Sequence, residues 1–411
     1  MKAEIITIGD ELLIGQVIDT NSAWLGQQLS LLGISLYQRT ACGDSKEQIL
    51  ACLHDAELRS DIIILTGGLG PTKDDITKKT LCEYFNTNLV TDEKVLAWVT
   101  HIFQMRKMPM LDINLQQALM PSNSKTLWNR SGTAPGIWFD VNNKIFISLP
   151  GVPFEMKVIF DEEVIPLLKQ KFELPTIYHR TLQTCSIGES FLAEKIKDIE
   201  NNLPSYIKLA YLPSVGTVRL RLSAHGDNKE KLIHEVSQIC NQFYERIGEY
   251  IYGEDNDNLS EVVGKLLKEK NKTLATAESC TGGFIAHQIT SIAGSSSYYK
   301  GSIISYDNKI KTLELNVSDV ILKNDGAVSE ACVKQMAQTI LNKFDVDYAI
   351  ATSGIAGPDG GSEEKPVGTV WIAIANKNEI IAKKYNMGDN RERTILRTSL
   401  MALDMLRKMI L

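Results

Sequence analysis

Long apolar runs are missing from this 411-residue chain, and no stretch approaches the ~20 apolar residues that a membrane-spanning helix needs. A basic excess is missing too. The chain has 44 Lys and Arg against 50 Asp and Glu, a formal net charge of -6, so we expect no polyanionic partner such as nucleic acid. The opening letters MKAEIITIGDE place acids where a secretory signal needs an apolar core. We therefore expect a cytoplasmic protein that does not associate with membranes.

Cysteine and histidine patterns that would indicate a disulfide framework or a zinc site are also missing. The seven cysteines are scattered, odd in number and never spaced as Cys-x-x-Cys, which favours reduced thiols. From residue 258 onward the only histidine is His287. A serine nucleophile in that region would therefore need another base, and lysine is a known alternative.

The chain length predicts two or three domains, and the element pattern divides it into three. In residues 1–172, buried strands alternate with helices, which indicates a parallel sheet covered on both faces. Residues 175–253 follow a strand, helix, strand, strand, helix order typical of a small α+β module. Residues 258–411 return to the α/β pattern. The predicted fold class is α/β, with α/β/α layers in both outer domains.

The middle module has the element order of some RNA-binding modules, so its charge and loops matter. Residues 176–253 contain 9 Lys and Arg and 9 Asp and Glu, a net charge of zero. The GXXG loop with which RNA-binding KH modules clamp a backbone is missing. We expect a KH-like spacer or dimerisation module, and a homodimer.

The motif TAESCTGG (276–283) places Ser279 between a predicted strand and a helix predicted to start near it. Backbone N–H groups are free at a helix start and can stabilise an oxyanion, while Gly282 and Gly283 allow close approach of a substrate. The alternative is that Ser279 only caps the helix. Cys280 is a rival nucleophile, to which we assign a packing role.

A lysine base must be neutral, so burial or nearby cations must lower its pKa. The segment YYKGSIISYDNKIK (298–311) supplies Tyr306 and Lys311, although a solvated lysine and a core tyrosine would give the same letters. The glycine-rich stretch SGIAGPDGGSEEKPVGT (353–369) follows a predicted strand. Such loops present N–H groups to anionic ligands, or serve as plain turns.

Three clusters mark the N-terminal region: GDELLIG (9–15), TGGLGPTKDD (66–75) and LPGVPFEM (149–156). Loops after parallel strands share one crevice. Gly67, Gly68 and Gly70 would admit a phosphate, which Asp74 and Asp75 would repel unless a divalent cation intervened. The alternative is a turn followed by a helix capped by Asp75.

In order and spacing, TAESCTGG, SYDNKIK, GAVS and SGIAGPDGG with KPVGT resemble the C-terminal domain of the CinA family, a nicotinamide-nucleotide amidase. The resemblance implies that Ser279 is the nucleophile, Lys311 its base and Tyr306 the partner that orients the lysine. It also implies that the Ser353 hydroxyl contacts the reacting group, and that no cofactor is needed. The implied substrate-binding residues are Cys280, Thr281, Gly282, Gly283, Gly354, Gly357 and either Arg391 or Arg393.

The N-terminal clusters, with Asn21 in DTN and RSGTAPG (130–136), resemble the molybdopterin-binding fold of the same family. The resemblance implies hydrolysis of ADP-ribose that depends on a divalent metal of the Mg or Co type, together with potassium. The implied metal or catalytic acids are Asp10, Asp44, Asp74 and Asp75. The implied phosphate and nucleotide residues are Asn21, Gly67, Gly68, Gly70 and Asp75.

The leading hypothesis is a bifunctional enzyme of pyridine-nucleotide recycling. It would deamidate nicotinamide mononucleotide and cleave ADP-ribose. One alternative is a single-activity amidase whose N-terminal domain binds nucleotide and assembles the dimer. Another is a non-enzymatic adaptor in competence or recombination.

Overall fold

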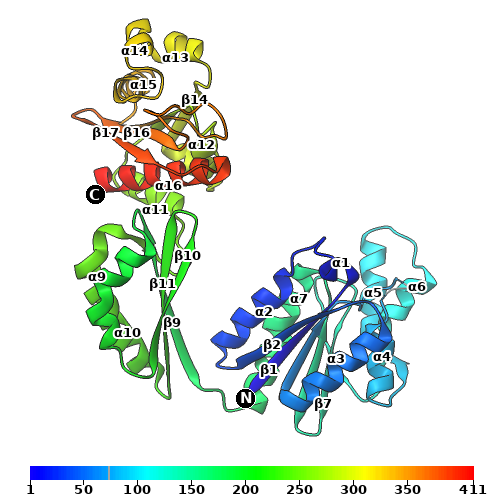
Figure 1. Ribbon diagram of the computed structural model, residues 1–411. Helices are drawn as coiled ribbons and strands as arrows, with labels where there is room; N and C mark the ends of the chain where they lie inside the picture. Colours follow the sequence, from blue (N-terminus) through cyan, green and yellow to red (C-terminus); the bar gives the residue numbers. More distant parts are fainter. Residues whose placement is uncertain (73–74) are drawn as a thin grey trace. The chain divides into compact units, whose positions relative to one another are not determined.

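The computed structural model describes residues 1–72 and 75–411, and it confirms the predicted α/β class (Figure 1). The chain separates into two compact units. One unit comprises Met1–Ile177 with His225–Lys229, and the other comprises Tyr178–Ala224 with Glu230–Leu411. Within the described ranges, none of the helices is both long and apolar enough to cross a bilayer.

A six-stranded sheet with strand order β2-β1-β3-β8-β7-β6 forms the centre of the first unit. Four strands are parallel, and β7 and β6 extend the sheet antiparallel. Asn142 and Asn143 turn the β7–β8 hairpin with φ of 53° and 61°, the left-handed conformation that a two-residue hairpin turn requires. The strands are β1 (Lys2–Ile8), β2 (Ser35–Cys42), β3 (Ile62–Thr66), β6 (Lys125–Leu127), β7 (Gly136–Val141) and β8 (Lys144–Leu149).

Helices cover both faces of this sheet because its central strands are buried on both sides. Helices α2 (Thr20–Leu31), α7 (Pro153–Ile159) and α8 (Ile165–Lys171) pack on one face, with a π-helical segment, Phe160–Val164, between the last two. Helices α3 (Lys46–Arg59) and α4 (Thr77–Tyr84) pack on the other. The remaining elements are α1 (Asp10–Leu13), β4 (Leu89–Thr91), α5 (Glu93–Met105), α6 (Asp112–Leu115), the 3-10 helix Gln116–Ala118 and β5 (Leu119–Pro121).

The middle module is an antiparallel sheet with two helices on one face (Figure 1). Residues of β11 alternate, so that Val218, Leu220 and Leu222 enter the core against both helices while their neighbours face away. The elements are β9 (Thr176–Cys185), α9 (Glu189–Asn201), β10 (Ile207–Ser214), β11 (Thr217–Gly226), α10 (Lys229–Ile247), the 3-10 helix Gly248–Tyr250 and β12 (Ile251–Glu254).

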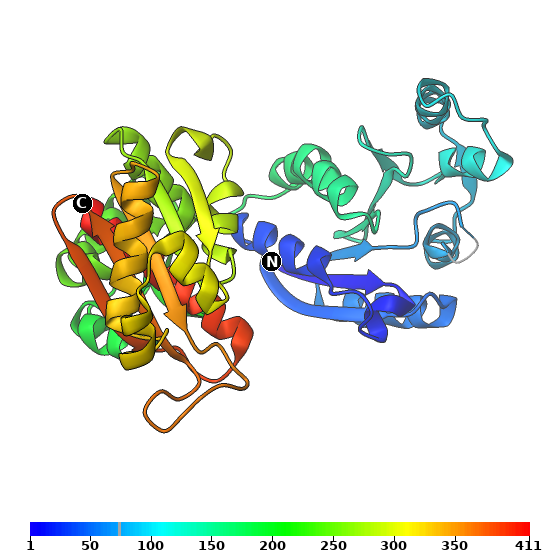
Figure 2. The same ribbon diagram turned by 90° about the horizontal axis from the view of Figure 1, so that it is seen from above.

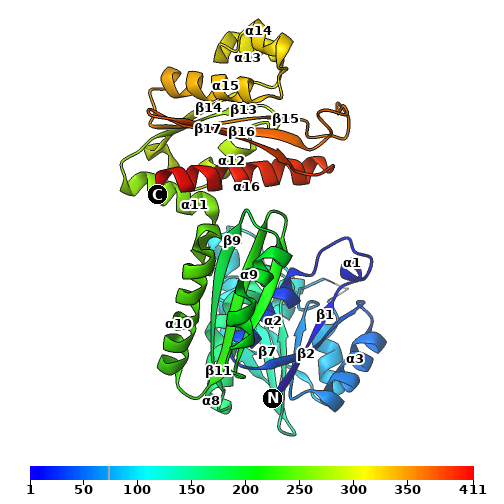
Figure 3. The same ribbon diagram turned by 60° about the vertical axis from the view of Figure 1, so that its left-hand side comes forward.

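The C-terminal domain is a five-stranded sheet, β14-β13-β15-β16-β17, between two helical layers (Figure 3). Strands β14, β13 and β15 are parallel, and β16 and β17 are antiparallel. The strands are β13 (Leu274–Glu278), β14 (Tyr299–Ile304), β15 (Tyr348–Gly354), β16 (Thr369–Asn376) and β17 (Ile380–Asn386). The glycine-rich loop between β15 and β16 extends away from the sheet (Figure 2).

The two layers bury different sets of side chains. Helices α11 (Leu259–Glu269), α12 (Phe284–Thr290) and α16 (Arg391–Ile410) share one core. Helices α13 (Asn308–Leu315) and α15 (Glu330–Lys343) pack on the opposite core, with α14 (Asp319–Asn324) and the 3-10 helix Ser295–Ser297 completing the domain.

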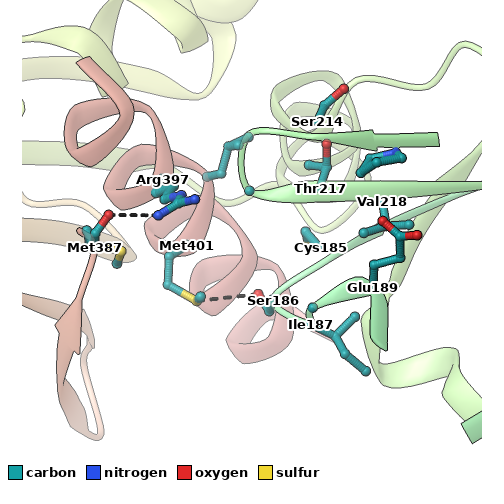
Figure 4. Close-up of a pocket in the computed structure, with 14 residues that line it drawn as sticks. Cys185, Ser186, Ile187, Glu189, Ser214, Thr217, Val218, Met387, Arg397 and Met401 are labelled. Carbon is teal, nitrogen blue, oxygen red and sulfur yellow. Dashed lines mark hydrogen bonds between the residues drawn. The ribbon is translucent and has the colours of Figure 1, made fainter. Parts of the chain in front are cut away.

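A buried ionic network joins the middle module to α16. Asp404 accepts hydrogen bonds from Arg407, from Lys408 and from the Ser186 hydroxyl of the middle module. Arg407 also donates to the Glu249 carbonyl at 3.0 Å. Burial raises the pKa of Asp404, but the bonds from Lys408 and Ser186 and the charge of Arg407 outweigh it and hold that pKa below its usual range. Beside this network lies a cavity of about 340 Å³ (Figure 4).

Candidate functional sites

Ser279 lies in a turn directly after β13, which corrects the predicted helix start. Helix α12 begins only at Phe284. Gly282 and Gly283 have φ of 59° and 94°, and this left-handed backbone keeps the residues between strand and helix out of a right-handed helix. The Ser279 N–H donates to the Thr352 carbonyl at 3.0 Å, so the serine is held to the end of β15.

The Glu278 carboxylate accepts hydrogen bonds from the N–H groups at the start of α12, which we predicted would stabilise an oxyanion. This fully buried carboxylate accepts from the N–H groups of Gly283, Ile285 and Ala286, at 3.0, 3.1 and 2.8 Å. It also accepts from the Thr281 hydroxyl at 2.7 Å. The N–H groups of Cys280 and Thr281 donate to no carbonyl within the described parts of the chain, so they remain the candidate oxyanion donors.

We expect Glu278→Gln to disturb this turn, because the amide NH2 replaces one carboxylate oxygen and then faces either the Ala286 N–H or the N–H groups of Gly283 and Ile285. Leaving such buried donors unpaired costs about 1–3 kcal/mol. Thermal unfolding should therefore occur at lower temperature, and turnover should fall more than tenfold. The matched control is Glu261→Gln on the exposed side of α11, which should change neither quantity. An unchanged melting temperature and turnover in Glu278→Gln would contradict this role.

Ser279 continues a row of side chains that faces α13 and α15. Ala275 and Ala277 of β13 enter the core on that face, and side chains alternate along a strand. The same alternation on β15 places Ser353 on this face, after Ala349 and Ala351. The carboxyl ends of β13 and β15 lie together because the strands are parallel. Ser279 and Ser353 therefore lie at the same end of the sheet.

Lys311 brings its amine to the same end of the sheet. The residue is 2 % exposed, and its Nζ donates to the carbonyls of Ser305 and Tyr306 at 2.8 and 3.3 Å. The Ser305 N–H in turn donates to the Glu278 carbonyl at 2.8 Å, one residue before Ser279. Burial lowers the pKa of Lys311, and within the described ranges no carboxylate forms a salt bridge with it. The solvated alternative for Lys311 is therefore wrong.

Cys280 differs from Ser279 in its electrostatic surroundings. Burial raises the pKa of its thiol to about 12, and the Glu278 carboxylate adds to that rise. A buried thiol with so high a pKa is a poor nucleophile at neutral pH. This supports the packing role assigned to Cys280.

Tyr306 is 60 % exposed, so the alternative of a core tyrosine is also wrong. Its hydroxyl accepts a hydrogen bond from Arg391 at 2.8 Å, while only its carbonyl contacts Lys311. Arg391 also donates to the Gly357 carbonyl at 2.9 Å, so it joins the glycine-rich loop to Tyr306. The structure brings Arg391 into this site, whereas Arg393 contributes its backbone N–H to the Asn390 cap of α16.

Three further predicted residues, Ser353, Gly354 and Thr281, make contacts within the protein that the sequence did not indicate. The Ser353 hydroxyl donates to the Ala327 carbonyl in the GAVS motif at 2.7 Å. A side chain at Gly354 would collide with Val370. The Thr281 hydroxyl is within 2.9 Å of the Thr352 hydroxyl, a contact that no sequence signal indicated.

The N-terminal clusters converge on a cavity of about 370 Å³ at the carboxyl ends of the strands. The three glycines Gly67, Gly68 and Gly70 line it. Gly67 has a second reason to be glycine, because a Cβ there would lie 2.3 Å from the Ile8 carbonyl oxygen. Carboxylates also line the cavity, from Glu11, Asp44, Asp75 and Glu155, and the described lining residues include no lysine, arginine or histidine.

The acidic residues predicted to bind a metal do not all line the cavity. Asp10 and Asp44 bond reciprocally, each accepting from the other's backbone N–H at 3.1 and 3.3 Å. Of these two, only Asp44 lines the cavity. Asp75 accepts from the N–H and hydroxyl of Thr72, so it caps its own loop rather than α4, whose cap is Ile76. Asp74 lies outside the described residues.

Oxygen donors around the cavity suit a hard divalent cation. Across residues 1–72 and 75–411, however, no three acidic, histidine or cysteine side chains are grouped closely enough to hold a metal alone. Among these described residues, a cation at the cavity would need further ligands from another group, such as a bound phosphate.

Asn21 lies beside this cavity and holds two loops together. Its amide Nδ2 donates to the Thr66 hydroxyl and the Gly151 carbonyl, at 3.1 and 2.8 Å.

Two residues near the cavity, Lys78 and Gln117, were not predicted from the sequence. The Lys78 amine, almost completely buried, donates to the Gln117 carbonyl at 3.1 Å. Burial lowers the pKa of Lys78 to about 8.

Together these features define a multidomain α/β protein whose N-terminal part is a molybdopterin-binding type of domain and whose C-terminal part is an α/β/α domain that carries Ser279 and Lys311. Residues 4–170 match the probable molybdopterin binding domain, 179–253 the KH domain of damage-inducible protein CinA, and 256–410 the CinA C-terminal domain. The chain belongs to the CinA family.

Two full-length relatives, from Cytophaga hutchinsonii and Flavobacterium psychrophilum, support this membership. A CinA-like protein of Cytophaga hutchinsonii is 51% identical over 408 residues, which is 99% of this chain and 98% of the relative. A CinA-like protein of Flavobacterium psychrophilum is 48% identical over 413 residues, covering 100% and 99%. The competence/damage inducible protein of Agrobacterium tumefaciens, solved by crystallography, is 38% identical over 36% of this chain and 92% of its own, with a TM-score of 0.36.

Proposed function

We propose that the C-terminal domain hydrolyses the carboxamide of nicotinamide mononucleotide to give nicotinate mononucleotide and ammonia. The observation that carries the proposal is the buried Lys311 amine, which bonds to the Ser305 carbonyl after β14, while the Ser305 N–H bonds to Glu278, the residue before Ser279. A lysine whose pKa is lowered by burial can remove the proton from a serine hydroxyl.

In the proposed reaction, Ser279 Oγ attacks the carboxamide carbon while Lys311 takes its proton. The N–H groups of Cys280 and Thr281 hold the oxyanion. The C–N bond then breaks, and Lys311 returns the proton to the leaving ammonia. Water attacks the ester, Lys311 accepts a proton from it, and Ser279 regains its hydroxyl as the carboxylate leaves. No step requires a metal ion.

The direct test is ammonia release by the full chain incubated with nicotinamide mononucleotide. We expect one ammonia and one nicotinate mononucleotide for each substrate consumed. If the wild-type chain releases no ammonia over a range of pH, the proposal fails.

The phosphate of the substrate is expected to bind Arg391, which lies at the site, and not Arg393. Arg391→Gln should raise KM by roughly 10- to 100-fold, the range for one lost charge-assisted hydrogen bond. Arg393→Gln is the matched control and should leave KM within about twofold. Nicotinamide riboside, which lacks the phosphate, should show the same KM with both variants. An Arg391 effect that persists with the riboside would mean that this arginine acts on something other than phosphate.

The acidic N-terminal cavity supports a second activity, cleavage of ADP-ribose at its pyrophosphate. Its four carboxylates would repel a diphosphate in the absence of a cation. Asp44 and Asp75 would help to hold a divalent cation of the Mg or Co type there. When bound, such a cation neutralises diphosphate charge and activates water. The glycines at 67, 68 and 70 give the diphosphate access to the backbone.

EDTA should therefore abolish AMP release from ADP-ribose, and added Mg²⁺ should restore it. Asp44→Asn should reduce AMP release by about 10²-fold or more if it holds the cation. Ammonia release from nicotinamide mononucleotide in the same sample serves as the internal control and should survive EDTA. AMP release that persists with EDTA present would remove the metal-dependent activity from consideration.

A further inference from the structure

Gln117, a residue of the N-terminal cavity wall, has a buried side-chain amide oxygen without a hydrogen-bond partner among the described residues. It is 3 % exposed and lines the cavity from the short helix Gln116–Ala118. Its side-chain Oε1 has no hydrogen-bond partner among the described residues. A buried amide oxygen without a partner destabilises the folded protein. Buried polar groups in folded proteins normally have partners. Nine described side chains carry an atom without one, and among them Gln117 lines the N-terminal cavity, where a ligand could supply the partner.

The segment that carries Gln117 is firmly held, so this orphaned oxygen does not reflect a loose loop. Lys78 donates to the Gln117 main-chain carbonyl at 3.1 Å from the buried side of α4. Asp92 at the start of α5 donates its N–H to the Ala118 carbonyl at 2.8 Å. Both bonds hold the main chain on either side of this amide.

Asn21 repeats the feature in an adjoining cavity of about 130 Å³. Its Oδ1 is also buried without a partner, although its Nδ2 makes two hydrogen bonds. The two cavities share Ile8, Glu11 and Gly151 in their walls. Two amide oxygens without partners and five acidic residues thus line the two adjoining cavities.

We propose that Gln117 recognises a hydrogen-bond donor on the ligand of the N-terminal cavity, which is a nucleoside diphosphate or its sugar derivative. This inference rests on the proposed ADP-ribose site and names a specificity-determining residue within it. The diphosphate takes the cation and the glycine loop, and a ribose hydroxyl or the amino group of the base donates to Gln117 Oε1.

The test compares Gln117→Met, which keeps the size of the side chain and removes the acceptor, with Gln116→Met at the exposed neighbouring position. Affinities are measured by calorimetry with Mg²⁺ for three probes: the α,β-methylene analogue of ADP-ribose, inosine diphosphate and inorganic pyrophosphate. Gln117→Met should weaken binding of the ADP-ribose analogue by about 10- to 100-fold and leave pyrophosphate unchanged. Gln116→Met should change none of the three. An equal loss for inosine diphosphate would assign the donor to the nucleoside ribose, and no loss for it would assign the donor to the adenine amino group or the terminal ribose, both of which inosine diphosphate lacks.

A second measurement separates recognition from a structural role. Because Gln117→Met removes an unpaired buried acceptor, the ligand-free variant should melt at the same or a higher temperature than the wild type. A lower melting temperature with unchanged affinity would overturn the proposal, as would an equal loss of pyrophosphate binding. If the wild type binds the analogue but cleaves no ADP-ribose, the pyrophosphatase proposal fails and the recognition by Gln117 stands. If it binds no nucleotide, both fail.

Discussion

Ser279→Ala should reduce kcat for ammonia release from nicotinamide mononucleotide by about 10³-fold or more, the usual scale for loss of a serine nucleophile. The alanine variant should fold normally, because the Ser279 backbone N–H, not its side chain, bonds to Thr352. Unchanged thermal unfolding would show that the loss is chemical. Substrate binding should persist, since Arg391 and the glycine-rich loop remain in place.

Cys280→Ala is the matched control one residue away. Because burial keeps this thiol protonated, its removal should lower turnover by no more than about tenfold through packing. Mass spectrometry of the wild type stopped during turnover should find the nicotinoyl group on Ser279. The opposite result, an inactive Cys280→Ala and an active Ser279→Ala, would transfer the chemistry to the thiol.

Lys311→Met should also reduce kcat by about 10³-fold, because the serine then has no base. In the wild type, the neutral amine is the active form, so kcat/KM should rise with pH and level off above the pKa of Lys311. Burial places that pKa below its ordinary value of 10.5. The rise should be absent from the residual activity of Lys311→Met. Lys309→Met, exposed on the same helix, is the control and should keep the wild-type profile. A wild-type profile that is flat from pH 6 to 10 would exclude Lys311 as the base.

The same burial makes a prediction about stability. The folded chain holds a proton on Lys311 less tightly than the unfolded chain does, so the unfolded state binds more protons between the two pKa values. The cost of burying the charged amine is therefore greatest below the folded pKa and disappears as pH rises past the unfolded value. The free energy of unfolding of the wild type should increase relative to Lys311→Met over that window.

Sequence reasoning succeeded where local chemistry decides structure. Continuous apolar letters identified β1 and β3, and the paired asparagines at 142 and 143 identified a hairpin turn that requires left-handed backbone. For Lys311, only the family resemblance favoured a buried base over a solvated side chain, and the structure shows that the residue is buried. The letters around that lysine do not show which way the side chain points, and burial depends on α15, which the sequence pattern did not reveal.

Sequence reasoning failed where the structure of a site depends on a residue far away in the chain or on the position of one oxygen atom. The strand-to-helix motif suggested that α12 starts at Ser279, but two glycines delay it to Phe284 and Glu278 takes its N–H groups. Nothing in the letters distinguishes Arg391 from Arg393. That choice depends on contacts with Tyr306 and Gly357, which are far away in the chain. Gln117 gave no signal because its significance is a missing partner.

The bonds of Asp404 and Arg407 to Ser186 and Glu249 mean that α16 is completed by residues that precede the C-terminal domain in the chain. Cutting the chain between β12 and α11 would leave a guanidinium and a carboxylate with fewer partners at the surface of the freed fragment. The middle module thus supplies hydrogen-bond partners to α16. The helix that carries Arg391 is therefore stabilised in part by residues outside its own domain.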